Sequence, residues 1–183
     1  MDVLGRRRAT SRWQAVWLVA ALAVVAIVVE VVVSGVRWPG GPLGLGGEGR
    51  AEACISVVGD EVVAFGQQVQ PTADLEVERA ELLDTQGVEL VDVVVMPLRG
   101  DAVAIGAMRL AGIEGDGPDG EGIPWDERVP AQGARLQAGT RYDVVVLLRG
   151  VGTTGVLRVE YRSGGARYAA EGIIVFELAR SCA

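Results

Sequence analysis

The sequence predicts an all-β domain, an antiparallel two-sheet sandwich of immunoglobulin-like type, preceded by one N-terminal transmembrane helix. Nineteen residues from 15 to 33 are apolar except for Glu30, which is enough for a helix to cross a hydrocarbon core of about 30 Å. From residue 51 onward, apolar and polar residues alternate in short runs divided by glycine, which is typical of strands. Cys54 and Cys182 lie near the two ends of that region.

Residues 1–12 form a basic tail, and residues 13–36 form the predicted signal anchor. Four arginines precede the apolar run and only Arg37 follows it closely, so we expect the N-terminus in the cytoplasm and the rest of a single-pass cell-membrane protein outside. A cleavable signal peptide has a shorter apolar region of about 7 to 15 residues. Two alternatives stay open, which are cleavage at the small residues 33–35 and twin-arginine export through Arg6 and Arg7.

Residues 37–50 contain so much glycine and proline that we expect no regular structure there. They predict a short tether, under about 20 Å from end to end for a glycine-rich coil of this length. Residues 51–183 then form one extracytoplasmic domain, because about 130 residues can bury a single core.

The expected strands within this domain follow each other at short intervals. An irregular alternation near Arg79 predicts a bulge, and the turn at Ser163, Gly164 and Gly165 predicts a tight hairpin that places Tyr161 opposite Tyr168. Eight or nine strands favour a sandwich, although a closed barrel fits the same spacing. The predicted strands span residues 53–58, 61–65, 75–82, 88–98, 103–110, 142–148, 156–162, 167–170 and 173–178.

The two cysteines predict a disulfide between Cys54 and Cys182, because an exported domain experiences an oxidising environment. Closing so long a loop would stabilise the fold by about 4.7 kcal/mol in the chain-entropy model. Unpaired thiols, an intermolecular bond or a two-cysteine metal site are the alternatives, but a soft metal normally takes more sulfur or imidazole ligands than this chain has.

The composition excludes several classes of function. The chain has no histidine and no lysine, so it holds no Ser-His-Asp or Cys-His nucleophile, no histidine-ligated metal, no Schiff base and no P-loop. Residues 51–183 carry eleven arginines against twenty-one carboxylates, a net charge of −10 that disfavours nucleic acid. We expect no catalytic residue and no cofactor, although a carboxylate pair of the glycosidase kind is formally possible.

The glycine-rich loop 112–124 carries Glu114, Asp116, Asp119 and Glu121. Clustered carboxylates on a loop suit calcium, so Asp116, Asp119 and Glu121 are weak candidates for metal ligands. Their spacing is not that of an EF-hand, and such loops are more commonly solvated connections. Partner recognition is a third interpretation of the loop.

Trp125 is the one tryptophan after residue 38, and Arg128 follows it closely. The pair is a possible contact for a protein partner, but a tryptophan at this place more often plugs one end of a sandwich core. Arg149, Arg158, Arg162 and Arg167 form the densest basic stretch. They suit either an anionic wall polymer or, more simply, cross-strand pairing with carboxylates.

The stretches 139–146 and 159–162, together with the late cysteine Cys182, resemble uncharacterised single-pass envelope proteins of high-GC Gram-positive bacteria. The resemblance implies an immunoglobulin-like extracytoplasmic domain and assigns no site. The expected function is therefore a membrane-anchored interaction or structural module with an envelope protein partner. An ion-binding domain, with calcium on the acidic loop, is the second hypothesis, and a carboxylate-dependent hydrolase is the third.

Overall fold

The computed structural model describes residues 16–17, 19, 23–25, 37–45, 51–114 and 120–182 of the 183-residue chain. Two compact units divide the chain, Met1–Val36 and Arg37–Ala183. In the first unit, the described residues are helical, but no described helix of the chain is long and apolar enough to cross a membrane. Most of the expected anchor 13–36, and all of the tail 1–12, lie outside the described residues, so both stay predictions.

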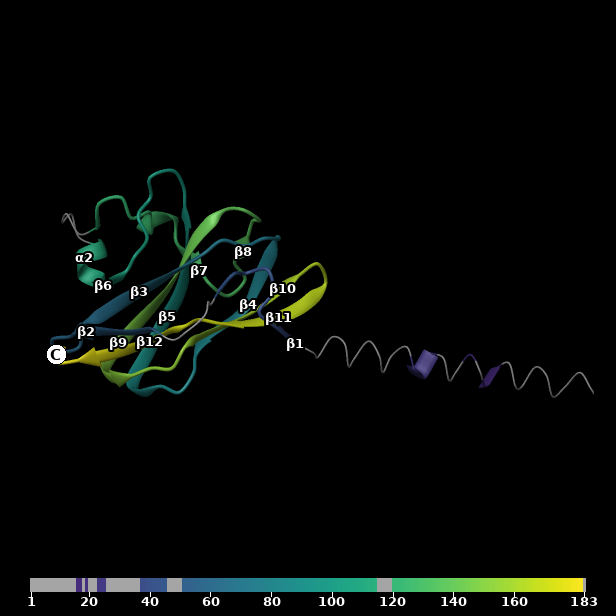
Figure 1. Cartoon of the computed structure of the whole chain (residues 1–183), viewed down its shortest axis with the longest axis horizontal. Coiled ribbons are helices and arrows are strands. Elements are labelled where there is room, and N and C mark those ends of the chain that lie inside the picture. Colours follow the sequence, from purple (N-terminus) through teal and green to yellow (C-terminus); the bar gives the residue numbers. More distant parts are fainter. Residues whose placement is uncertain are drawn as a thin grey trace, which may run out of the picture. The chain divides into compact units, whose positions relative to one another are not determined.

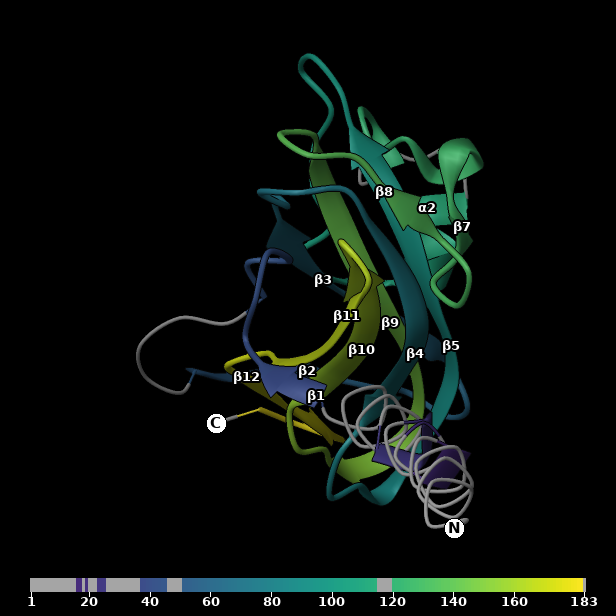
Figure 2. The same ribbon diagram turned by 90° about the vertical axis from the view of Figure 1, so that its right-hand side faces the viewer.

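The second unit is a sandwich of two β-sheets, which confirms the all-β, two-sheet part of the prediction (Figures 1 and 2). Sheet A holds, in spatial order, β1 (Arg37–Pro39), β11 (Ala166–Glu171), β10 (Leu157–Ser163), β4 (Leu75–Leu82) and β8 (Arg135–Leu136). Sheet B holds β2 (Ala51–Ser56), β12 (Ile174–Ala179), β9 (Arg141–Thr153), β3 (Val62–Val69) and β6 (Ala107–Arg109), with β5 (Gln86–Leu98) pairing β9 and β7 (Val129–Pro130) pairing β5.

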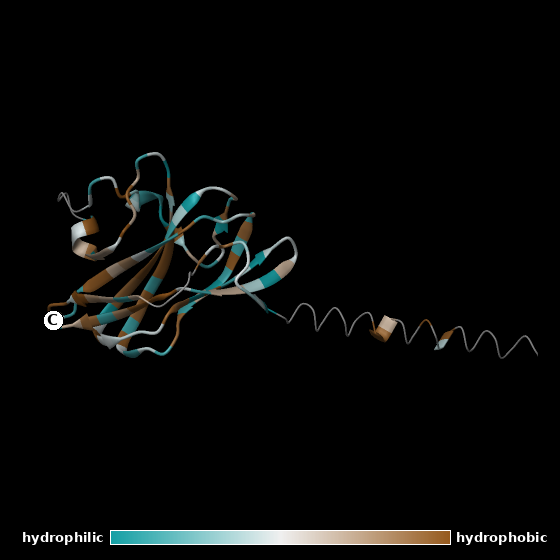
Figure 3. Cartoon of the chain, in the orientation of Figure 1, coloured by the Kyte–Doolittle hydropathy of each residue, from teal (hydrophilic) through white to brown (hydrophobic). Residues whose placement is uncertain are grey.

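The main core lies between the two sheets and is built from the inward-facing residues of every long strand. Alternation along β9 places Val144, Val146 and Leu148 in this core. Phe65 of β3 and Phe176 of β12 pack with ring centroids 4.2 Å apart. Figure 3 shows the apolar residues concentrated on these strands.

A second core lies on the outer face of sheet B. Val145 and Leu147 of β9 point into it, so the run from Tyr142 to Leu148 is buried throughout. It is covered by the short helix α2 (Leu110–Glu114) and the 3-10 turn η2 (Trp125–Glu127), which contribute Ile113 and Trp125. Sheet B is therefore covered on both faces along β3, β5 and β9.

Several strand predictions are confirmed and two are wrong. The hairpin between β10 and β11 pairs Tyr161 with Tyr168 as expected, and the bulge in β4 lies at Glu78, beside the expected Arg79. The prediction of wholly antiparallel pairing is wrong, because β1 pairs β11 and β2 pairs β12 in parallel. The strand expected over 103–110 is reduced to β6, because Leu110 begins α2, which turns Ile113 into the second core.

Residues 37–45, here named the N-terminal strap, are not a free tether, which corrects the predicted boundary at residue 51. β1 adds to the edge of sheet A, and Gly40 donates to the carbonyl oxygen of Ala169 at 3.0 Å. Leu43 has no exposed surface and Leu45 is also buried, and both belong to the main core. Two buried leucines outweigh the flexibility of the intervening glycines.

The buried hydroxyl of Tyr161 holds the strap in place. It donates to the carbonyl oxygen of Gly40 at 2.5 Å and accepts from the amide of Leu43 at 3.2 Å. Burial raises the pKa of this hydroxyl, which keeps its proton available for Gly40. A side chain at Gly41 would collide with this hydroxyl and with the ring of Tyr168, so the glycine is required by close approach.

The predicted disulfide between Cys54 and Cys182 is confirmed, with the two Cα atoms 6.0 Å apart. Cys54 lies in β2, at the edge of sheet B, and Cys182 follows β12, the strand that pairs with β2. The bond therefore fastens the edge strand to its neighbour and closes a loop of 128 positions.

Leu43→Ala tests the strap. We expect a loss of about 2–5 kcal/mol in the free energy of unfolding, as for other leucines removed from a core. Val58→Ala is the control, because Val58 is 74% exposed and its truncation should cost less than about 0.5 kcal/mol. Denaturant unfolding measures both, and a neutral Leu43→Ala variant would mean that residues 37–45 form a tether after all.

Replacing both cysteines by serine tests the disulfide. Because the closed loop restricts the unfolded chain, we expect the double variant to lose about 2–5 kcal/mol of unfolding free energy. Urea unfolding of the wild type with and without reductant provides the internal control. Equal stability of the oxidised and reduced wild type would show that the bond restrains nothing.

Candidate functional site: the charged face of sheet A

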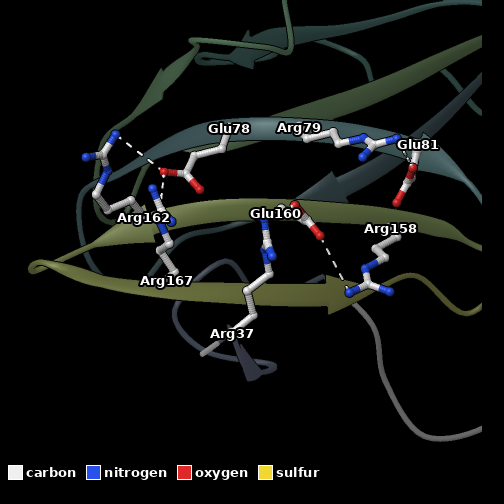
Figure 4. A network of polar contacts seen from close by, with 8 residues as sticks. All are labelled: Arg37, Glu78, Arg79, Glu81, Arg158, Glu160, Arg162 and Arg167. Atoms are coloured by element: carbon white, nitrogen blue, oxygen red, sulfur yellow. Dashed lines mark ion pairs between the residues drawn. The ribbon is translucent and has the colours of Figure 1, made fainter. Parts of the chain in front are cut away.

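The outer face of sheet A carries a connected set of arginines and glutamates that no second core covers (Figure 4). They come from four strands that are far apart in the sequence, β1, β4, β10 and β11. We name this set the charged face, and its members are Arg37, Glu78, Arg79, Glu81, Arg158, Glu160, Arg162 and Arg167.

Glu160 lies between two arginines at one end of the charged face. Its carboxylate oxygens are 2.8 Å from Nη2 of Arg37 and 3.5 Å from Nη2 of Arg158. The side chain of Glu160 is only 10% exposed, so its charge depends on these partners. One carboxylate against two guanidinium groups leaves one net positive charge.

Glu78 repeats this arrangement at the other end. It is the extra residue of the β4 bulge, and its Oε1 lies 3.4 Å from both Arg162 and Arg167. Bulges redirect a side chain relative to the regular pleat, which explains how one carboxylate serves two strands. Arg79 pairs separately with Glu81 at 2.7 Å.

The charged face has a positive excess within an acidic domain. With Glu76, Arg135 and Glu171, which the strand register places on the same face, it holds six arginines and five glutamates, a charge of +1, whereas residues 51–183 carry −10. Exposed ion pairs contribute only about 0–1 kcal/mol each to stability. The main effect of the pairing is therefore to hold the guanidinium groups in defined orientations.

Sequence reasoning found part of this site. Cross-strand pairing with a carboxylate is confirmed for Arg162 and Arg167, which bind Glu78 of β4, whereas Arg158 pairs with Glu160 of its own strand. Arg149 also pairs across strands, but in sheet B, where it lies 3.9 Å from Glu89 of β5 and 3.8 Å from Asp60. Arg37 was missed because it stood in the expected tether. A strand of three residues is too short to show a periodic pattern. The only available signal for β1 was therefore a charged residue, Arg37, between an apolar run and Trp38.

Trp125 lies in the second core and is 8% exposed, so it plugs the outer face of sheet B rather than one end of the sandwich. Its Nε1 donates to Glu114 at 3.3 Å, and the guanidinium of Arg128 stacks 4.4 Å from the ring centre. The indole is thus used inside the protein, which does not favour it as a partner contact. Arg128 remains exposed.

The weak metal candidates are not brought together within the described part of the chain. Asp116 and Asp119 lie outside the described residues, and Glu121 is exposed. No group of three or more acidic, histidine or cysteine side chains able to hold a metal occurs among residues that the structure describes. Calcium binding by this loop stays a prediction.

Asp143 is a buried carboxylate that sequence reasoning missed. Its Oδ2 accepts from the amide of Ile105 at 2.6 Å, which pins the loop after β5 onto sheet B, whereas Oδ1 is buried without a hydrogen-bond partner. Burial raises the pKa of Asp143 to about 6, although the Ile105 bond opposes the shift. A carboxylate inside the apolar run 142–148 was the available signal.

Two comparisons with known proteins found no relative of this chain. A scan against protein-family models found no match to the chain, and a search of curated proteins found no match either. A role for the charged face therefore has to follow from its own chemistry.

Asp143→Asn tests the buried charge. The folded-state pKa of about 6 exceeds the usual 3.8, so the folded wild type binds more protons than the unfolded chain between these pH values. Its stability should therefore fall as pH rises from about 4 to about 6. The stability of Asp143→Asn relative to wild type should rise by about 2 kcal/mol over this interval.

Denaturant unfolding at a series of pH values measures the unfolding free energy of both proteins. The change of their difference with pH is unaffected by any pH-independent destabilisation that the asparagine causes. Asp92→Asn is the control, because Asp92 is an exposed carboxylate of β5. A difference between Asp143→Asn and wild type that does not change with pH would contradict the raised pKa.

Proposed function

We propose that this protein is a membrane-anchored, extracytoplasmic interaction or structural module of the cell envelope, and that it binds a protein partner through the charged face. The proposed anchor is the helix over residues 13–36, with the N-terminus in the cytoplasm. We also propose the finer description of the sandwich as immunoglobulin-like, as in the envelope proteins that the sequence resembles. The observation that supports the role best is the set of oriented arginines on an otherwise acidic domain.

Orientation of these arginines favours recognition. Arginine is enriched at protein interfaces, and its planar fork binds carboxylates with two parallel hydrogen bonds. A free arginine loses side-chain entropy on binding, but Arg162 and Arg167 are already held by Glu78. A partner surface with exposed carboxylates would match the positive excess of the charged face and would meet it at low entropic cost.

Other classes of partner and activity have less support. The net charge of −10 disfavours nucleic acid, because phosphates would be repelled by most of the surface. Catalysis by a carboxylate pair would need two carboxylates in one cleft with separated pKa values, and Asp143, whose pKa burial raises, is fully buried. Calcium on the acidic loop stays the alternative.

In-membrane cross-linking of the tagged full-length chain tests the proposed partner. We expect one envelope protein to be recovered reproducibly by mass spectrometry above a control that carries only the proposed anchor, residues 1–36. The double variant Arg79→Glu and Arg162→Glu should reduce this recovery at least tenfold, because it reverses two charges on the charged face.

Arg99→Glu is the matched control, because Arg99 also forms an exposed ion pair, with Glu127, but lies outside the charged face. It should leave the recovery unchanged. The proposal would be contradicted if the chain recovers only itself, or if the charge-reversed variant, shown to be folded by its unfolding transition, recovers the same partner as the wild type.

A further inference from the structure

A cavity of about 470 Å³ lies where the N-terminal strap meets the charged face. Its walls differ in character, with two guanidinium groups on one side and apolar surface on another. The residues that line it include Arg37, Pro39, Leu45, Arg158, Ala169 and Glu171.

Arg158, one of the residues that line this cavity, has a hydrogen-bond donor that the protein leaves unused. Its Nε is buried and has no acceptor, although its Nη2 pairs with Glu160. A buried donor without an acceptor costs about 1–3 kcal/mol, and such a group in a native structure commonly indicates an absent water or ion. Arg37 shares the same carboxylate, so Arg37, Arg158 and Glu160 together carry one net positive charge, which the carboxylate of Glu171 on the cavity wall offsets.

We propose that this cavity binds a phosphate group, supplied by the headgroup of a membrane phospholipid. A phosphate offers several acceptor oxygens, which suits two guanidinium groups that approach from different strands. Pro39, Leu45 and Ala169 give the first carbons of a phospholipid's acyl chains an apolar wall.

The lipid source rests on the proposed anchor, whereas recognition of phosphate does not. Arg37, which lines the cavity, directly follows the predicted span 13–36 in the sequence, so under the proposed anchor phospholipid is a ready source of phosphate. Trp38 is 56% exposed beside it, and tryptophan favours the membrane interface. A soluble phosphate is the other source of the same chemistry.

Glu171 opposes the bound anion and provides an internal test. It lines the cavity from β11, where its Cα lies opposite that of Arg158. Because a carboxylate repels phosphate, Glu171→Gln should tighten phosphate binding, whereas loss of Arg158 Nε should weaken it. A merely structural role for this ion pair would not produce opposite effects.

The experiment uses the full-length chain in dodecyl maltoside micelles, which contain no phosphate. Inorganic phosphate is titrated against chloride at equal ionic strength, and the arginine Nε resonances are followed by NMR. We expect a saturable shift of one Nε resonance that is absent from Arg158→Lys. This variant keeps the positive charge near Glu160 but lacks Nε, and its affinity for phosphate should be at least tenfold lower.

Arg79→Lys is the matched control, because Arg79 belongs to the charged face but does not line the cavity. It should bind phosphate like the wild type, and Arg37→Gln should bind more weakly. No saturable shift, or equal binding by wild type and Arg158→Lys, would overturn the phosphate site. Neither result depends on recovery of a protein partner.

The source of the phosphate is decided by a second titration with dihexanoyl phosphatidylglycerol and with glycerol 3-phosphate. At least tenfold tighter binding of the lipid than of glycerol 3-phosphate supports a membrane headgroup. Only the lipid has acyl chains, which can insert into the micelle and contact the apolar wall in addition to the phosphate contacts. Equal or weaker binding of the lipid would overturn the lipid source and would identify a site for soluble phosphate.

Discussion

The unequal covering of the two sheets determines what this domain can present to a partner. Sheet B is packed between two cores, because β9 sends Val144 and Val146 into the main core and Val145 and Leu147 into the second core. Sheet A buries only its inner face, so alternate positions of β4, β10 and β11 are free to carry charge. Under the proposed function, recognition is expected on sheet A, and the helix α2 and the turn η2 cover sheet B.

The N-terminal strap connects that surface to the part of the chain before residue 37. Tyr161 belongs to β10, the central strand of sheet A, and its hydroxyl binds two groups of the strap. Arg37 of the same strap pairs with Glu160, the neighbour of Tyr161. Under the proposed anchor at 13–36, the charged face begins at the first residue beyond the membrane span.

Much of the sandwich was predictable, because strands that cover a core carry an alternating pattern. The hairpin at Gly164 and Gly165 and the disulfide followed from turn chemistry and from the placement of the two cysteines. The strap was not predictable, because two buried leucines among glycines have no periodicity. The continuous apolar run 142–148 indicated a strand buried on both faces. Nothing in that run indicated which segment of the chain would cover the outer face.

Native-state hydrogen exchange of the full-length chain tests most directly whether the domain begins at Arg37. The account predicts strong protection of the amides of Gly40 and Leu43, because they donate to Ala169 and Tyr161 within the sandwich. Protection should approach that of Val145 in the centre of β9. Exchange of Gly40 and Leu43 at the rate of an unstructured peptide, with Val145 still protected, would contradict the account and restore a flexible tether.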